Sequence, residues 1–261
     1  FEVLLGTILN HLFNDGKVSD VEIAQIAQAA ENKFFGKPCG LLDQMTSSVG
    51  SFVEIDFADP ANPVIEKLDF DFASCGYALC IVDTGGSHSD LTDEYAAVRK
   101  EMESVAEYLG KSVLREVDED EFMKNIADIR SSCGDRAVLR AMHFYGDNAR
   151  VEKQAAALKA GDFETFKKYI IESGRSSYMY NQNVYSCKKA SEQPVSLALS
   201  LSEKLLDGCG AWRVHGGGFA GTIQAFVPLN KLDEYKDLME KVFGSGSCYI
   251  LSVRPVGGVE L

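Results

Sequence analysis

Three successive glycines separate two apparent strands in residues 211–227, AWRVHGGGFAGTIQAFV. Apolar residues dominate on both sides of the glycines, as is typical of short buried strands. A helical pattern at 232–243 and a strand near 249–253 follow, and a continuous apolar run at 77–82 predicts another strand upstream. Because these strands follow a long helical stretch, the sequence predicts an α+β fold with helices packed on one face of an antiparallel sheet.

The chain before residue 76 has its own pattern of elements. The spacing Ser19-x-x-Glu22 is a capping box, which begins a helix that ends at Gly36. Two strands are predicted after it, around 52–57 and 64–70. The sequence therefore predicts two domains, 1–75 and 76–261, the second of which contains helices at about 135–173, with a break at Gly161, and at 194–206.

Charge and composition limit the partners of this protein. The 261 residues include 26 Lys and Arg against 39 Asp and Glu, a net charge of −13. Such an excess of negative charge disfavours nucleic acid and membrane partners. No apolar run has the roughly 18 residues of a membrane span, no secretory leader opens the chain, and the seven cysteines show no C-x-x-C pair. We expect a cytoplasmic protein with reduced thiols.

The first residues predict a helix that is already under way. Apolar residues recur at helical spacing from Val3 to Phe13, with no capping residue ahead of them. We therefore interpret the sequence as a fragment from which an upstream segment is missing.

Glu31 and Asp43 are the first candidates for chemistry. Ile23, Ile26, Ala27, Ala30 and Phe34 form the apolar stripe of the first long helix, and Glu31 lies on or at the border of that face. It either reaches solvent or needs a cation or donor. Asp43 follows Gly40 in the first turn of a short predicted helix, where the helix dipole alone favours a carboxylate. The alternative is that the two residues serve as a metal ligand and a base, as phosphoryl transfer requires.

Two glycine loops are the other candidates. The loop at 215–221 either permits an unusual turn or lets a ligand approach the backbone closely, and it is not a G-x-x-x-x-G-K-[ST] phosphate loop. The loop from Asp83 to His88 precedes a helix capped by Thr92. Tyr95 follows on the apolar face of that helix, where it is a core residue unless its hydroxyl meets a polar ligand.

Residues 31–44, with the pattern E-x-x-F-x-G-x-P-C-G-x-x-D-Q, closely resemble the corresponding segment of galactokinases. Galactokinases belong to the superfamily that also contains homoserine, mevalonate and phosphomevalonate kinases. Residues 215–221 look like the third, glycine-rich motif of this family, and residues 93–95 fall where the family carries its S-E-Y element. The resemblance implies a two-domain sugar-kinase fold, here truncated at its N-terminus.

The resemblance also implies roles for individual residues. Asp43 matches the catalytic aspartate that accepts or orients the proton of the anomeric hydroxyl of galactose as that oxygen attacks the γ-phosphorus of ATP. Glu31 matches the ligand of Mg²⁺. Gly40 and Tyr95 match residues that contact galactose, the first through its backbone and the second through its phenol. The implied reaction converts D-galactose and ATP to galactose 1-phosphate, with Mg²⁺ as cofactor.

Several features depart from the family pattern. His215 replaces a usual threonine, Ala220 a usual glycine, and residues 178–183 (YMYNQN) differ from the common D-D-Y-x-V-S pattern. These departures concern the shape of the sugar pocket. The family's sugar-gripping first motif and its phosphate loop are absent, so we expect this chain alone to be inactive. The alternatives are a kinase for N-acetylgalactosamine or an arabinose-like sugar, and a regulatory homologue that senses galactose and ATP without catalysis.

Overall fold

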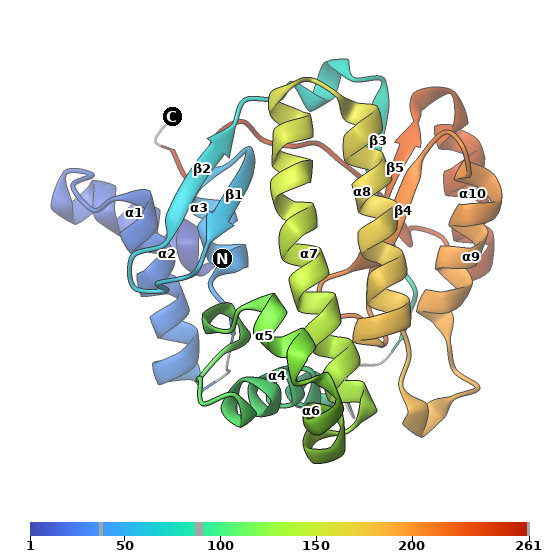
Figure 1. Cartoon of the computed structure of the whole chain (residues 1–261). Helices are drawn as coiled ribbons and strands as arrows, with labels where there is room; N and C mark the ends of the chain where they lie inside the picture. The colour runs from blue at the N-terminus through green and yellow to red at the C-terminus, as the bar shows by residue number, and fades with distance from the viewer. Residues whose placement is uncertain (37–38, 87–90, 260–261) are drawn as a thin grey trace. The chain divides into compact units, whose positions relative to one another are not determined.

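The protein is described by a computed structural model over residues 1–36, 39–86 and 91–259. The chain forms two compact units, Phe1–Asp71 with Val253–Leu261, and Phe72–Ser252. Figure 1 shows the elements of each unit. Within the described ranges, no helix combines the length and apolar character that crossing a membrane requires.

The units differ from the expected domains 1–75 and 76–261 because the end of the chain returns to the first unit. The backbone N–H of Ser51 donates to the carbonyl oxygen of Arg254 at 2.7 Å. Lys67 Nζ donates to the carbonyl oxygen of Pro255 at 2.6 Å. These bonds join residues about 200 positions apart, which no local sequence pattern reports.

In the described part of the first unit, three α-helices and a two-stranded sheet have the bounds α1 Glu2–Asn14, α2 Asp20–Ala29, α3 Leu42–Val49, β1 Phe52–Asp56 and β2 Val64–Leu68. The capping box is present, since Ser19 Oγ accepts from Glu22 N while Glu22 Oε2 accepts from Ser19 N. The two strands pair antiparallel, with Phe52 opposite Leu68.

The apolar stripe expected on the first long helix is only partly buried. Ile23 and Ala27 are in the core, but Ile26 is 58% exposed and Phe34 is 87% exposed. The α-helical spacing ends at Ala29, and a π-helical turn at Ala30–Phe35 follows. A π turn uses an i to i+5 bond, so Phe34 no longer falls on the face that Ile23 and Ala27 define.

The second unit carries the remaining helices and a four-stranded sheet. Its principal elements are β3 Tyr77–Asp83, α4 Thr92–Tyr108, α5 Glu119–Lys124, α6 Ile126–Cys133, α7 Asp135–Lys159, α8 Phe163–Ser176, α9 Pro194–Leu206, β4 Ala211–His215, β5 Thr222–Pro228, α10 Leu232–Phe243 and β6 Cys248–Leu251. The strand order is β4-β5-β3-β6, and all neighbours are antiparallel. Thr92 is the first residue of α4, not its cap, because Leu91 occupies the capping position.

Helices cover both faces of this sheet, not one as expected, with α8 on one side of β3, β4 and β5 and α9 and α10 on the other (Figure 1). Cys80 and Ala225 lie in a core that includes Ala198 of α9 and Tyr235 of α10. Successive strand residues face opposite sides, so Phe226 points the other way. Its ring lies 5.4 to 5.9 Å from three other phenylalanine rings, of which two belong to α8. The sequence pattern of the strands indicated that their residues are buried. It did not predict helices on both faces of the sheet, because these depend on contacts between residues far apart in the sequence.

Candidate functional site

Glu31 lies on the π-helical turn that follows α2. The turn ends at Gly36, whose φ of 80° is in the left-handed region that glycine adopts without strain. The side chain of Glu31 is half-buried, and its Oε2 accepts from Gln44 Nε2 at 3.0 Å. The expected carboxylate at the border of the buried face is therefore present, and its donor comes from α3.

Asp43 lies next to Gln44 in the first turn of α3, with an exposed side chain. The backbone just before α3 is tied to the end of the preceding helix. Asn32 Oδ1 accepts from Cys39 N at 2.7 Å, and Gln28 Nε2 donates to the carbonyl oxygen of Cys39 at 3.2 Å. These bonds and the Gln44 bridge bring the Glu31 turn and the start of α3 together. Lys37 and Pro38, between them, lie outside the described residues.

Gly40 offers open space beside this turn. A side chain built on Gly40 would meet no atom within 4 Å in the described structure. The backbone at Gly40 is therefore accessible to a ligand, as a residue that contacts substrate through its main chain must be.

The residues present fit a magnesium ion held partly by substrate. Among the described residues, no three His, Cys, Asp or Glu side chains form a group that could hold a metal ion. Mg²⁺ does not need such a group, because it commonly takes one or two carboxylates and completes its shell with waters and substrate phosphates. The carboxylate of Glu31 and the buried amide oxygen of Gln44, which has no hydrogen-bond partner in the described structure, are hard oxygen donors of the appropriate kind.

The glycine loop at 215–221 is the connection between β4 and β5, which pair with His215 opposite Thr222. Gly216 and Gly218 have positive φ angles of 64° and 82°, so the loop is the unusual turn that one hypothesis required. Other residues of the chain also pack closely against the backbone of this loop. A Cβ atom on Gly217 would lie 2.6 Å from Cε1 of Tyr95, and a Cβ atom on Gly218 would lie 1.8 Å from the carbonyl oxygen of Asn183.

Tyr95 is built into this loop. Its hydroxyl donates to the carbonyl oxygen of Gly218 at 2.9 Å, and its ring meets that of Phe219 edge to face at 5.2 Å. Burial raises the pKa of the phenol above its ordinary value, because it disfavours the charged form. Tyr95 is therefore a neutral hydrogen-bond donor to the glycine loop. His88 of the neighbouring loop lies outside the described residues.

Asn183 was not identified as a site residue from the sequence. Its carbonyl oxygen accepts from Phe219 N at 2.6 Å, and its Nδ2 donates to the carbonyl oxygen of Gly217 at 3.3 Å. Its buried Oδ1 has no partner among the described residues. The only signal in the sequence was the departure of residues 178–183 from the family pattern.

The other departures are accommodated locally. His215 is exposed, and its Nδ1 lies 3.0 Å from Oε1 of Gln224 on the paired strand. Ala220 packs against Gly86, where any Cβ atom would lie 2.8 Å from that of Ala220. The carbonyl oxygen of Ala220 would be closer still, at 2.4 Å, so position 86 has no room for a side chain beside the backbone of residue 220.

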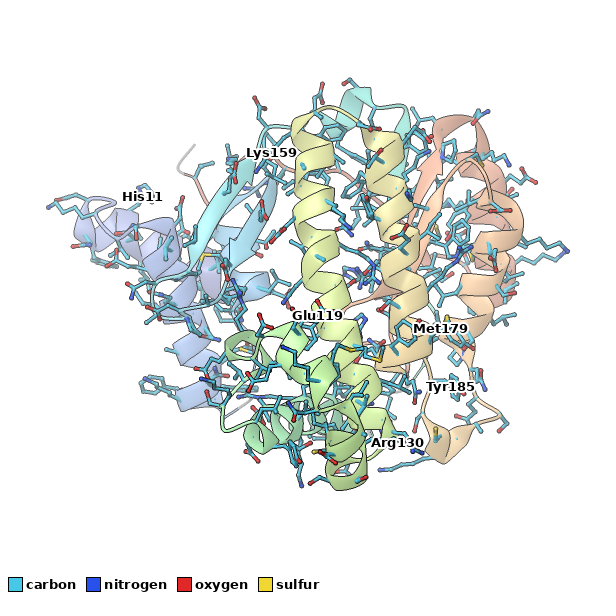
Figure 2. The ribbon with its side chains drawn as sticks, viewed as in Figure 1. His11, Glu119, Arg130, Lys159, Met179 and Tyr185 are labelled. Carbon is cyan, nitrogen blue, oxygen red and sulfur yellow. The ribbon has the colours of Figure 1, made fainter. Side chains whose placement is uncertain are left out.

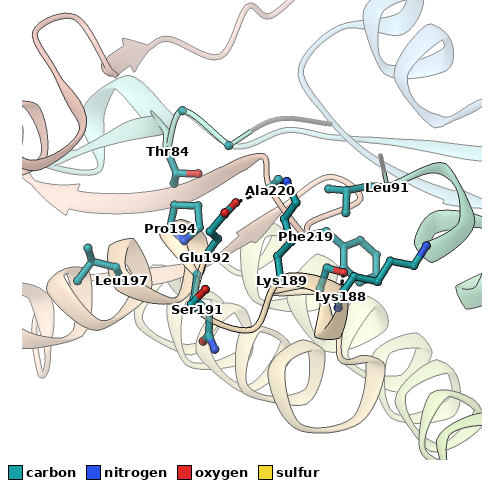
Figure 3. Close-up of a pocket in the computed structure, with 14 residues that line it drawn as sticks. Thr84, Leu91, Lys188, Lys189, Ser191, Glu192, Pro194, Leu197, Phe219 and Ala220 are labelled. Atoms are coloured by element: carbon teal, nitrogen blue, oxygen red, sulfur yellow. Dashed lines mark hydrogen bonds and ion pairs between the residues drawn. The ribbon is translucent and has the colours of Figure 1, made fainter. Parts of the chain in front are cut away.

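A pocket of about 730 Å³ lies beside the glycine loop in the second unit. Figure 3 shows Leu91, Phe219 and Leu197 among its apolar lining. Two lysines from the segment before α9 also line it, and both are paired with carboxylates at 3.2 and 3.8 Å. The pocket has the size of a small-molecule site and is adjacent to a loop that presents backbone groups.

Comparisons with known proteins show which proteins this chain is similar to. Residues 1–51 match the family model of the GHMP kinases N terminal domain. The human galactokinase is 30% identical over 260 residues, which cover 100% of this chain and 62% of that protein. The galactokinase of Actinobacillus pleuropneumoniae is 28% identical over 238 residues, 91% of this chain and 59% of that protein. The crystal structure of Lactococcus lactis galactokinase complexed with galactose superposes with a TM-score of 0.74 at 22% identity, over 100% of this chain and 66% of that chain.

The resemblance to galactokinases is confirmed. The galactokinase fold is confirmed with it, as a mixture of helices and antiparallel sheets. The chain spans about three fifths of the length of the curated relatives that it matches.

Proposed function

We propose that the protein containing this chain transfers the γ-phosphoryl group of ATP to the anomeric hydroxyl of D-galactose, giving galactose 1-phosphate, in the cytoplasm. The observation that carries the proposal is the hydrogen bond from the side chain of Gln44 to the carboxylate of Glu31. Asp43, which precedes Gln44 in the sequence, has an exposed carboxylate. Both carboxylates belong to the segment that resembles galactokinases. Phosphoryl transfer needs an oriented nucleophile and compensation of phosphate charge, which are tasks for two separate carboxylates.

Asp43 would accept the proton of the anomeric hydroxyl or orient it. Its position in the first turn of α3 leaves the exposed carboxylate accessible to substrate. Glu31 would hold Mg²⁺, which when bound supplies positive charge at the phosphates. Gly40 and Tyr95 would contact the sugar, the first through its backbone and the second through its phenol, whose hydroxyl donates to the carbonyl oxygen of Gly218.

Two alternatives concern the choice of ligand and the chemistry. N-acetylgalactosamine or an arabinose-like sugar would use the same carboxylates, and the segment 178–183 departs from the family pattern where it meets the glycine loop. A sensor of galactose and ATP would have less need of a base. The retained Asp43 and Glu31 therefore favour a kinase.

The test is galactose-dependent ADP release by the complete natural protein that contains this chain, at saturating Mg²⁺ and ATP. We expect Asp43→Asn to abolish most of the release while it leaves galactose binding measurable. Asp20→Asn is the matched control, because Asp20 is an exposed aspartate in the first turn of α2. Binding of galactose without ADP release by the wild type would instead support the sensor, and faster release with N-acetylgalactosamine would change the assigned substrate.

A further inference from the structure

A second pocket, of about 410 Å³, lies in the second unit, and none of the residues given a role in the kinase proposal lines it. Six of its eight lining side chains come from residues 178–187, and the other two are Glu94 and Arg136. Figure 2 labels Met179 and Tyr185 of this group, beyond the C-terminal end of α8. Three of these residues, Tyr178, Met179 and Gln182, belong to the segment 178–183, in which this chain departs from the galactokinase pattern.

The backbone of this segment has an unusual conformation. A π-helical turn at Ser177–Asn181 ends at Gln182, a non-glycine residue with φ 55° and ψ 43°. Arg140 Nε holds the turn by donating to the carbonyl oxygen of Asn181 at 3.0 Å. Left-handed residues other than glycine and single π turns occur often at functional sites. Here they place the side chain of Gln182 in the wall of the pocket.

The charges around the pocket balance. Glu101 accepts from Arg136 at 2.5 Å and from Arg140 at 2.9 Å. Glu94 supplies a second carboxylate, which is only 8% exposed and acts on Arg136 electrostatically. Two guanidinium groups and two carboxylates leave no net charge with which to hold an ion. The occupant that fits is therefore uncharged.

The polar groups of the pocket specify what that occupant must offer. The carboxylate of Glu94, whose Oε1 accepts from Ser186 at 2.8 Å, can accept a further hydrogen bond from a ligand hydroxyl. Gln182 can both donate and accept. The rings of Tyr178 and Tyr185, with centroids 6.3 Å apart, add apolar surface. Hydroxyl donors combined with an apolar face describe a sugar ring.

We propose that this pocket, whose lining residues differ from those of the Asp43 turn, binds an uncharged monosaccharide. The inference does not require the kinase proposal, because its residues and those of the proposed catalysis are different. Its volume lies within the usual range of small-molecule sites.

Two cysteines allow sugar binding to be tested separately at the pocket and at the Asp43 turn. Cys187 lines the pocket and is exposed, whereas Cys39 is half-buried beside the Asp43 turn. Alkylation by iodoacetamide would be followed at each cysteine by peptide mass spectrometry, with and without D-galactose. At a sugar concentration about ten times the Kd, occupancy lowers the rate at a protected thiol about tenfold.

We expect D-galactose to protect Cys187. Gln182→Gly and Tyr178→Ala should remove this protection, and the glycine variant suits the left-handed backbone, so it tests the side chain without a cost to folding. Tyr249→Ala is the matched control, because Tyr249 is an exposed tyrosine on β6 that does not line the pocket. Its protection should equal that of the wild type.

Three results would overturn the proposal. The first is a rate of Cys187 alkylation that saturating D-galactose does not change. The second is protection of Cys187 that persists in both Gln182→Gly and Tyr178→Ala, and the third is protection of Cys187 by galactose 1-phosphate but not by galactose. Protection of Cys39 alone would support sugar binding at the proposed catalytic turn while it rejects the second site. The two proposals therefore fail separately.

Discussion

Removing the carboxylate of Glu101 should destabilise the second unit more than its place near the protein surface suggests. Glu101, on α4, accepts from Arg136 through two nitrogens and from Arg140 through Nη1. The Arg140 side chain is 1% exposed, against 22% for Glu101 and 42% for Arg136. Glu101→Ala would therefore leave a fully buried guanidinium without its counterion.

The expected cost can be worked from this geometry. Breaking a buried ion pair by removing one partner costs about 3–5 kcal/mol, because the remaining charge stays buried and uncompensated. Arg140 keeps its bond to the carbonyl oxygen of Asn181, and Glu101 is partly solvated, so the lower end applies. We expect a loss of about 3 kcal/mol in the free energy of unfolding, which is a shift of about 1–1.5 M in the urea midpoint.

Trp212 provides the assay. It is the only tryptophan and lies buried in the core of the same unit, so its fluorescence in urea reports the unfolding of that unit. Glu103→Ala is the control on the same helix, because its partner Arg99 is 83% exposed and such surface pairs are worth about 0–1 kcal/mol. Equal midpoints for the two variants would refute the argument that burial of Arg140 makes the Glu101 pair important.

Three further predictions use the same fluorescence titration. Burial lowers the pKa of His143 below its ordinary 6.5, so below that pH the unfolded chain takes up a proton on this side chain more readily than the native protein does. The contribution of His143 to the free energy of unfolding should be complete above about pH 6.5 and should fall by at most about 1.4 kcal/mol per pH unit as the pH decreases. His143→Gln should remove this part of the pH dependence of stability. Gly218→Ala should disrupt the glycine loop and ADP release, because its Cβ atom would lie 1.8 Å from the carbonyl oxygen of Asn183, whereas Gly216→Ala meets nothing within 4 Å and should cost only about 1–2 kcal/mol of backbone strain; equal effects would contradict the packing argument. Tyr235→Phe should cost about 1 kcal/mol through the loss of a buried hydroxyl bond, and an unchanged midpoint would contradict that assignment.

Local signals allowed much of the secondary structure to be predicted. The Ser19 and Glu22 side chains satisfy backbone groups within three residues, so their spacing alone predicts the beginning of α2. Pro194 fits the first turn of α9, and the helix has the bounds that the pattern predicted. Such features could be predicted because each depends on neighbours in the sequence.

The faces that these elements bury were harder to predict. Leu4, Leu9 and Leu12 of α1 follow helical periodicity, yet they are 56%, 55% and 68% exposed, whereas Thr7 and Asn10 are buried. Thr7 and Asn10 can be buried because their side chains form hydrogen bonds inside the unit. Thr7 Oγ1 donates to the carbonyl oxygen of Val3, and Asn10 Nδ2 donates to the carbonyl oxygen of Val18. Periodicity indicates an apolar face, but the residues that cover it are decided by tertiary packing.

The two neighbouring residues Glu94 and Tyr95 show why a candidate site cannot be completed from a motif. Both belong to the segment that corresponds to the S-E-Y element, but their side chains serve different places. The phenol of Tyr95 bonds to the glycine loop 123 residues away, while the carboxylate of Glu94 bonds to Ser186 and lines the second pocket. Because successive residues on a helix point about 100° apart, one short motif can belong to two sites. Resemblance identified the motif. The different directions of its two side chains distinguish the glycine loop, which the kinase proposal uses, from the pocket that the proposal leaves unassigned.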